Sequence, residues 1–334
     1  MAISSSLALA LVGLVALAAP AAQAQPLKVP LGLDASALVV PADNPITPEK
    51  VALGKQLFFD PRWSRGKNVS CASCHDPEHA WADPRRFSLR TDGKPTPRHS
   101  PTVINRAFST AQQWTGARAS LEDQAIKSSD SDPETIVKHL GPIPGYQQQF
   151  QKVFGTGVTP ENFAKAVAAF ERSILSGNAP YDRYLAGDKS AMSPAAVRGF
   201  TVFVGKGGCV SCHSGANFSD ERYHNLGVGM DKEKPDLGRH AITKADADRG
   251  AFKTPTLRDV AKRPPYMHDG SLTSLAEVVA FYDRGGVANP ARSAQVRTLE
   301  LTATERADLV AFMEALTGEV DPTIKSRPTL PPDP

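Results

Sequence analysis

All four cysteines of this 334-residue chain lie in two copies of one short pattern. The first copy is Cys71-Ala72-Ser73-Cys74-His75 and the second is Cys209-Val210-Ser211-Cys212-His213. C-x-x-C-H is the attachment pattern of c-type haem, in which the two thiols form thioethers and the histidine ligates the iron. The spacing therefore predicts two covalently attached c-type haems, with His75 and His213 as iron ligands.

Three other kinds of site use paired cysteines: a thioredoxin-like redox centre, a tetrahedral zinc site and a pair of short disulfides. Neither a redox centre nor a zinc ribbon requires a histidine directly after the second cysteine. Because that histidine is present in both copies and no cysteine lies outside them, haem attachment is the best interpretation.

Residues 264–286, PPYMHDGSLTSLAEVVAFYDRGG, contain three side chains that could bind a metal or simply pack. Met267 offers a thioether, His268 an imidazole and Tyr282 a phenol oxygen. Tyr282 shares a predicted helix face with Leu275 and Val279, which suits a core residue but also an inward-pointing ligand. The spacing alone leaves the three open.

Short N-terminal signals predict the helices that would position these residues. Thr47-Pro48, Thr159-Pro160 and Ser193-Pro194 each combine an N-cap with a proline at the first helical position. Residues 274–277 and 302–305 each form a capping box. Apolar residues recur at helical spacing, with the helix after Thr159 expected to stop at Gly177, and alternating strand patterns are nearly absent. We therefore expect a mainly α fold with long irregular loops.

A weak internal repeat divides the chain. Gly54 and Phe58 precede the first haem pattern, and Gly199 and Phe203 precede the second with the same spacing. We expect two cytochrome c-like haem domains, one at residues 25–180 and the other at 190–320. The boundary should lie in the turn-rich segment 176–193, and a proline-rich tail should follow at 321–334.

The first residues predict secretion. Residues 7–19 are apolar but too short to span a bilayer, and Ala22-Gln23-Ala24 fits the cleavage site of a signal peptide. We expect residues 1–24 to be removed and the mature protein to be periplasmic, with no membrane span. The formal net charge of +3 indicates neither a nucleic-acid-binding protein nor a membrane-surface protein.

Five stretches occur in order between residues 45 and 317: LGKQLFFDPRWSRGKNVSCASCHDPEHAW, RHSPTVINRAF, QWTGARASLEDQA, FKTPTLRDV and PPYMHDGSLTSLAEVV. Together they resemble the bacterial dihaem cytochrome c peroxidase family. That family contains peroxidases that reduce hydrogen peroxide, and also the MauG-type enzyme, which matures methylamine dehydrogenase by oxidising a partner protein. The resemblance implies that the N-terminal haem is the peroxide site and that the C-terminal haem handles electrons.

The resemblance also assigns catalytic residues. In the family a tryptophan lies between the haems, a glutamine follows it by ten residues and a catalytic glutamate follows by ten more. Trp114, Gln124 and Glu134 reproduce this spacing. Trp114 could instead be a core residue, and Glu134 could be an ordinary first-turn carboxylate. A helix N-terminus would also keep a buried carboxylate ionised and able to accept a proton from peroxide.

Two departures from the family surround the N-terminal haem. Many members carry a displaceable histidine in the loop that here reads FSLRTDGKPTPRHSPT, and Thr91 takes its place. We interpret His79 and His99 as loop or supporting residues, so the N-terminal iron should have no sixth protein ligand. His99 also replaces an asparagine that helps to bind calcium in the family. A neutral imidazole is a poor calcium ligand, so calcium binding stays open.

The resemblance also bears on the sixth ligand of the second haem. In the family this ligand lies fourteen residues after the histidine of the PYFHDG motif, and it is methionine in ordinary peroxidases and tyrosine in the MauG-type enzyme. Here that position is Tyr282, counted from His268, and Met267 is the rival. We expect His268 near the haems without binding iron. A phenolate stabilises high oxidation states, whereas a thioether raises the potential.

Together these residues predict a periplasmic MauG-like dihaem peroxidase that reduces hydrogen peroxide through high-valent haem iron. Its electrons would come from a small redox protein, either a cytochrome c or a cupredoxin. One alternative is a MauG-type oxidase that modifies a partner protein. The other is a dihaem electron-transfer cytochrome, which would need neither Gln124 nor Glu134.

Overall fold

The structure is a computed structural model that describes residues 27–128, 130 and 132–334. The predicted signal peptide, residues 1–24, lies outside the described residues. None of the helices in this part of the chain combines the length and the apolar character that a membrane span requires.

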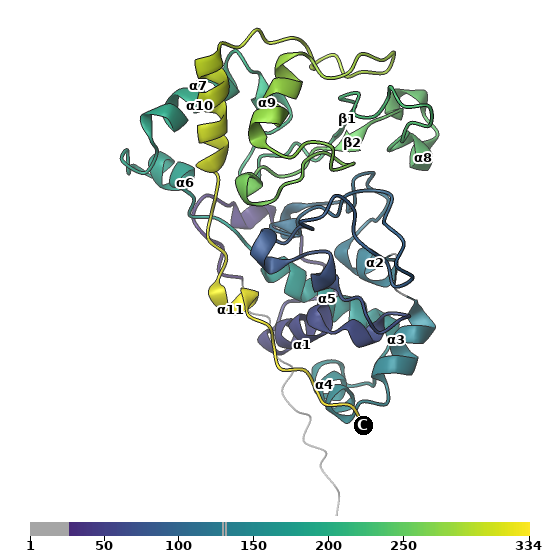
Figure 1. Ribbon diagram of the computed structural model, residues 1–334. Helices are drawn as coiled ribbons and strands as arrows, with labels where there is room; N and C mark the ends of the chain where they lie inside the picture. The colour runs from purple at the N-terminus through teal and green to yellow at the C-terminus, as the bar shows by residue number, and fades with distance from the viewer. Residues whose placement is uncertain (1–26, 129, 131) are drawn as a thin grey trace, which may run out of the picture.

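Short helices joined by long loops dominate the fold, with one small sheet (Figure 1). The prediction of a mainly α fold is confirmed. The strands β1 (Tyr223–His224) and β2 (Phe252–Lys253) pair antiparallel, and the first three residues of each haem pattern form the 3-10 helices Cys71–Ser73 and Cys209–Ser211. The α-helices are α1 Pro48–Phe59, α2 Leu121–Ile126, α3 Pro133–Leu140, α4 Pro144–Phe154, α5 Pro160–Ser173, α6 Pro180–Leu185, α7 Pro194–Val204, α8 His240–Thr243, α9 Leu275–Asp283, α10 Ala303–Glu314 and α11 Pro322–Lys325.

The predicted helix starts are present. The hydroxyls of Thr47, Thr159 and Ser193 each accept a hydrogen bond from the backbone three residues later, and both capping boxes form at the starts of α9 and α10. One end differs from the prediction, because α5 stops at Ser173 rather than near Gly177. Beyond it the chain turns to Asn105, whose side chain bonds the backbone N–H and carbonyl of Ser176.

The internal repeat corresponds to one packing arrangement used twice. Gly54 of α1 lies against α5, where an added Cβ would be 1.9 Å from the Ala166 carbonyl oxygen. Gly199 of α7 lies against α10 in the same way, 1.9 Å from the Asp308 carbonyl oxygen. Each glycine therefore allows two helices to approach closely beside a haem pattern, and each helix pair belongs to its own hydrophobic core.

Figure 1 shows two lobes, one built on α1–α5 and the other on α7, α9 and α10, with the C-terminal segment returning from α10 to the first lobe. Lys55 donates to the Thr323 carbonyl at 2.5 Å and Gln56 to the Thr329 carbonyl at 3.0 Å. Arg62 donates to Asp333 at 2.6 Å. The predicted proline-rich tail is thus packed along the N-terminal lobe.

Candidate active site

The first haem pattern lies on the wall of a cavity in the N-terminal lobe. This cavity has a volume of about 400 Å3, and Cys71, Cys74 and His75 line it together with Trp114 and Gln124. Ser70 and Ser73 cap the short helix at the pattern by reciprocal side-chain hydrogen bonds. The local capping therefore holds both thiols and the imidazole on one side of the cavity.

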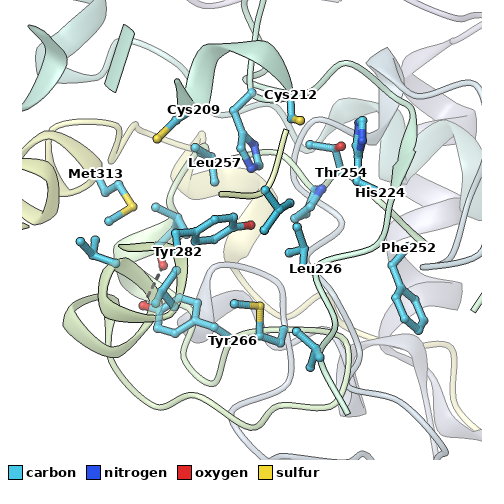
Figure 2. Close-up of a pocket in the computed structure, with 18 of the residues that line it drawn as sticks. Cys209, Cys212, His224, Leu226, Phe252, Thr254, Leu257, Tyr266, Tyr282 and Met313 are labelled. Atoms are coloured by element: carbon cyan, nitrogen blue, oxygen red, sulfur yellow. Dashed lines mark hydrogen bonds between the residues drawn. The ribbon is translucent and has the colours of Figure 1, made fainter. Parts of the chain in front are cut away.

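The second haem pattern lines a more apolar cavity in the C-terminal lobe, of about 200 Å3. Cys209, Cys212 and His213 form one wall, and Tyr282 of α9 contributes from another. Figure 2 shows the phenol oxygen of Tyr282 pointing into this cavity, below the segment that carries the two cysteines.

Both pattern histidines are suited to bind a metal. Burial lowers the pKa of His75 to about 4 and also lowers the pKa of His213, so both rings are neutral at pH 7 and keep a lone pair for coordination. His213 Nδ1 lies 3.0 Å from the Phe218 carbonyl oxygen, which leaves Nε2 as the ligand atom. The Nδ1 atom of His75 is buried without a hydrogen-bond partner among the described residues.

Tyr282 is half-buried and, unlike the two buried tyrosines, has no polar partner among the described residues. Tyr146 donates to Asp60 at 2.6 Å, and Tyr266 donates to the Val260 carbonyl at 3.1 Å. The Tyr282 hydroxyl makes no hydrogen bond to any described residue, and burial raises its pKa well above the usual value. Because this oxygen points into the cavity, it is available to a group bound there.

The rival ligand also lines the C-terminal cavity. Met267 has a left-handed backbone with φ 71° and contributes to the wall, as does Met313 of α10. His268 stacks on Phe252 with ring centroids 3.6 Å apart, and burial lowers its pKa to about 4. All three candidate side chains of the 264–286 segment therefore line the same cavity, so either Tyr282 or Met267 could reach a haem bound there.

A thin wall separates the two cavities. Five residues line both of them: His99, Trp114, Lys253, Thr254 and Pro255. The indole N–H of Trp114 donates to the His99 carbonyl at 2.8 Å, and its own carbonyl accepts from the Lys253 N–H of β2 at 2.7 Å. These bonds fix Trp114 from both sides, between the cavities where the resemblance places it.

Gln124 and Glu134 occupy different environments. Gln124 of α2 lines the N-terminal cavity, and its side-chain oxygen is buried without a hydrogen-bond partner among the described residues. Glu134 lies in the first turn of α3 with its side chain exposed, outside the residues that line either cavity. The structure therefore brings Trp114 and Gln124 together at the cavity and leaves Glu134 on the surface.

Thr91 lies outside the N-terminal cavity and holds a residue that lines it. Its backbone N–H and its hydroxyl both donate to one carboxylate oxygen of Asp130, each at 2.9 Å. Asp130 is buried and lines the cavity. The position that carries a displaceable histidine in the family is thus occupied here by a side chain that binds the neighbouring loop.

His79 and His99, the two histidines nearest to Thr91 in the sequence, both contact other groups of the protein. His79 Nδ1 lies 2.9 Å from Asp76, and the ring is away from the cavity lining. His99 is buried in the wall, its Nδ1 lies 3.2 Å from the Arg85 carbonyl, and its backbone N–H donates to His268. Burial lowers the pKa of His99, so its ring is neutral and engaged with a carbonyl.

The sequence analysis missed several charged residues of the cavity walls. Arg106 and Glu171 line the N-terminal cavity, and burial raises the pKa of Glu171 to about 8. Lys253 pairs with Glu221 at 2.6 Å, and burial lowers its pKa to about 8. Arg106 and Lys253 lie in two of the quoted motifs, and Glu171 interrupts the apolar face of α5, so a signal was present for each.

Among the described residues, Cys212, Asp220 and His224 form a cluster of possible metal ligands. His224 Nε2 lies 2.8 Å from an Asp220 carboxylate oxygen. Since Cys212 belongs to the second haem pattern, this cluster is part of that site rather than a separate metal centre.

Both cavities fit a c-type haem. Each presents two free thiols and a neutral imidazole on one wall. Each is also lined by a residue with a buried polar atom that has no hydrogen-bond partner among the described residues, Gln124 Oε1 in the N-terminal cavity and Arg263 Nε in the C-terminal one. When bound, haem supplies an iron that exchanges electrons and reacts with peroxide.

Comparison with known proteins agrees with this arrangement. Residues 48–190 match the di-haem cytochrome c peroxidase family and residues 196–317 match cytochrome c. The chain is 44% identical over 301 residues to the methylamine utilization protein MauG of Methylorubrum extorquens, covering 87% of this chain and 84% of that protein. It is 34% identical over 316 residues to the cytochrome c551 peroxidase of Nitrosomonas europaea, covering 89% and 91%.

Solved structures show the same fold. A MauG-like protein associated with microbial copper homeostasis has a TM-score of 0.81 and 30% identity, covering 87% of this chain and 96% of that chain. The dihaem peroxidase BthA from Burkholderia thailandensis has a TM-score of 0.71 at 21% identity, which supports the fold alone. With two cytochrome c-like lobes, two haem patterns and relatives that cover most of its length, the chain belongs to the dihaem cytochrome c peroxidase family and is a dihaem peroxidase.

Proposed function

We propose that this protein is a periplasmic MauG-like dihaem peroxidase that reduces hydrogen peroxide. The observation that carries the MauG-like assignment is Tyr282, whose hydroxyl points into the C-terminal cavity and makes no hydrogen bond to any described residue. Covalent haems at Cys71 and Cys74 and at Cys209 and Cys212 belong to the same proposal. His213 and Tyr282 would then bind the second iron from opposite sides.

The residues around the N-terminal cavity support a peroxide site. Of the described residues that line it, the histidines are His75, on the attachment segment, and His99, whose ring is engaged with a backbone carbonyl. This favours an open side where Gln124 can orient peroxide. We propose Glu134 as the proton acceptor from its spacing to Gln124 alone. Its position gives no further support, because its side chain is exposed.

The wall between the cavities supports a route for electrons or oxidising equivalents. Trp114 touches both cavities and is held at its indole and at its backbone. We propose that it connects the two haems, with electrons supplied by a small redox protein such as a cytochrome c or a cupredoxin. An oxidisable partner protein in place of this donor would make the protein a MauG-type oxidase.

Replacing Tyr282 tests the proposal. Tyr282→Phe removes one oxygen and leaves no protein group unpaired, so the fold should be kept. Loss of an anionic ligand should raise the reduction potential of the C-terminal haem and change its electron paramagnetic resonance spectrum. Met267→Leu is the matched control, since it removes the rival thioether from the same wall.

The two variants separate the alternatives. A changed spectrum and potential in Tyr282→Phe, with Met267→Leu unchanged, would support the tyrosine ligand. The reverse pattern would make Met267 the ligand and would return the protein to the ordinary cytochrome c peroxidases.

A further inference from the structure

Three arginines of the described chain are buried, and two of them have carboxylate partners. Arg172, 2% exposed, donates to Glu122 at 2.6 Å and 3.0 Å. Arg258 pairs with Asp182 at 2.6 Å, with both side chains 1% exposed. A buried charge is costly unless it is paired, and these two arginines follow that rule.

The third buried arginine, Arg263, has no carboxylate partner among the described residues. Its residue exposure is 7%, its Nη2 donates to the Thr256 carbonyl, and its Nε is buried without a hydrogen bond. Burial lowers the pKa of Arg263 to about 10, and the nearby Asp259 carboxylate opposes this only in part. That carboxylate accepts hydrogen bonds from the Ser176 hydroxyl and the Gly318 N–H. No described carboxylate therefore forms an ion pair with this buried guanidinium.

Arg263 lines the C-terminal cavity. Burial lowers the pKa values of His213, the pattern histidine, and of His99 in the wall between the cavities, and the positive charge of Arg263 adds to this effect. No ion pair or hydrogen bond joins Arg263 to Cys209 or Cys212 in the described chain. A haem carries its vinyl groups on one edge and its two propionate carboxylates on another, so the cysteines and an anion-binding residue are needed at different places.

We propose that Arg263 binds a propionate carboxylate of the C-terminal haem and neutralises its charge beside the iron. The inference rests on the proposed haem in this cavity, but it does not depend on whether Tyr282 is the sixth ligand. Guanidinium donors form a planar fork that matches a carboxylate, which a single ammonium group does not reproduce. Arg263 would act as a positioning residue that also sets the potential.

The charge of Arg263 predicts the direction in which the reduction potential of the C-terminal haem should change when this residue is replaced. A propionate without its cation stabilises ferric over ferrous iron, because the ferric centre carries one more positive charge. In the haem-loaded Arg263→Gln variant we expect the ferric-to-ferrous equilibrium of the C-terminal haem to move at least about tenfold toward ferric. For a one-electron couple this is a fall in potential of about 59 mV.

Spectroelectrochemical titration measures that shift, and resonance Raman spectroscopy of the propionate bending band reports the lost hydrogen bonds. Arg263→Lys should keep most of the potential and still change the band, because the charge stays while the fork is lost. Arg297→Gln is the control: Arg297 lines the same cavity but is exposed, so water should screen its loss.

Wild-type potential and band in Arg263→Gln would overturn the proposal. A shift produced by Arg297→Gln but not by Arg263→Gln would also overturn it, because the propionate would then interact with the exposed Arg297. If Arg263→Gln fails to retain haem, the Arg263→Lys variant decides the question. An unchanged propionate bending band in that variant would also overturn the proposal. Failure of the tyrosine ligand would show instead in the Tyr282→Phe spectra.

Discussion

Gln124 and Glu134 belong to one predicted spacing, but Gln124 lines the N-terminal cavity and Glu134 is exposed on the surface. For Glu134→Gln we expect the reaction with hydrogen peroxide to slow by about 100- to 10,000-fold, the usual contribution of a general base. Stopped-flow absorbance at the Soret band measures the rate, with haem content checked in parallel. An unchanged rate would assign Glu134 to the solvated start of α3, where the structure leaves it.

Thr91 supports a second prediction at the residue scale. Because it binds Asp130 instead of offering an imidazole, the diferric protein should contain one high-spin haem and react with peroxide directly. Electron paramagnetic resonance of the resting protein and a peroxide titration without reductant test this. An all-low-spin spectrum, with reactivity only after one-electron reduction, would show that another side chain occupies the iron.

Among the elements, the helix pairs α1 with α5 and α7 with α10 depend on one glycine each. An added Cβ at Gly54 or Gly199 would lie 1.9 Å from a carbonyl oxygen of the facing helix. Each alanine variant should therefore lower the free energy of unfolding by about 1–3 kcal/mol, the usual range for overpacking. Guanidinium denaturation followed by circular dichroism measures the loss.

Gly157 provides the control for these variants. An added Cβ there meets no atom within 4 Å, so Gly157→Ala should stay within about 0.5 kcal/mol of the parent protein. Equal stability of all three variants would mean that the helix pairs separate easily and that the glycines are not required for their approach.

For the whole molecule, the C-terminal segment contributes to the lobe at the opposite end of the sequence. Removing residues 327–334 deletes the contacts of Gln56 and Arg62 with Thr329, Pro331 and Asp333. At a net ~0.5–1.5 kcal/mol for each hydrogen bond, and less where exposed, we expect a loss of about 1–3 kcal/mol in the N-terminal lobe.

Hydrogen exchange locates this loss. Protection should fall in α1 and α4 and stay unchanged in α7 and α10. Asp333→Asn, which removes a single ion pair with an exposed carboxylate, should change stability by less than about 1 kcal/mol. Unchanged protection of α1 after the truncation would show that the tail merely lies on the surface.

Haem content is the other property of the whole molecule. The two patterns predict an intact mass that exceeds the polypeptide by two haem groups after export and maturation. Cys209→Ala with Cys212→Ala should reduce the excess to one, with the N-terminal haem retained. A parent mass with one haem or none would contradict the proposed function.

Patterns between near neighbours in the chain could be predicted from the sequence. Both haem patterns and the helix starts at Thr47, Thr159 and Ser193 depend on residues within a few positions of one another, so local geometry alone specifies them. The mainly α fold follows from the same signals. The spacing of Trp114 and Gln124, recognised through the resemblance, led to residues that the structure places on one cavity.

Tertiary structure decided what depends on distant segments. The return of the tail to α1, the unpaired charge of Arg263 and the wall shared by His99, Trp114 and Lys253 join residues far apart in the chain. The exposed position of Glu134 is of the same kind, because a first-turn carboxylate can face solvent or a cavity with identical local sequence. Burial and partners arise only when the whole chain is packed, and no short-range pattern contains them.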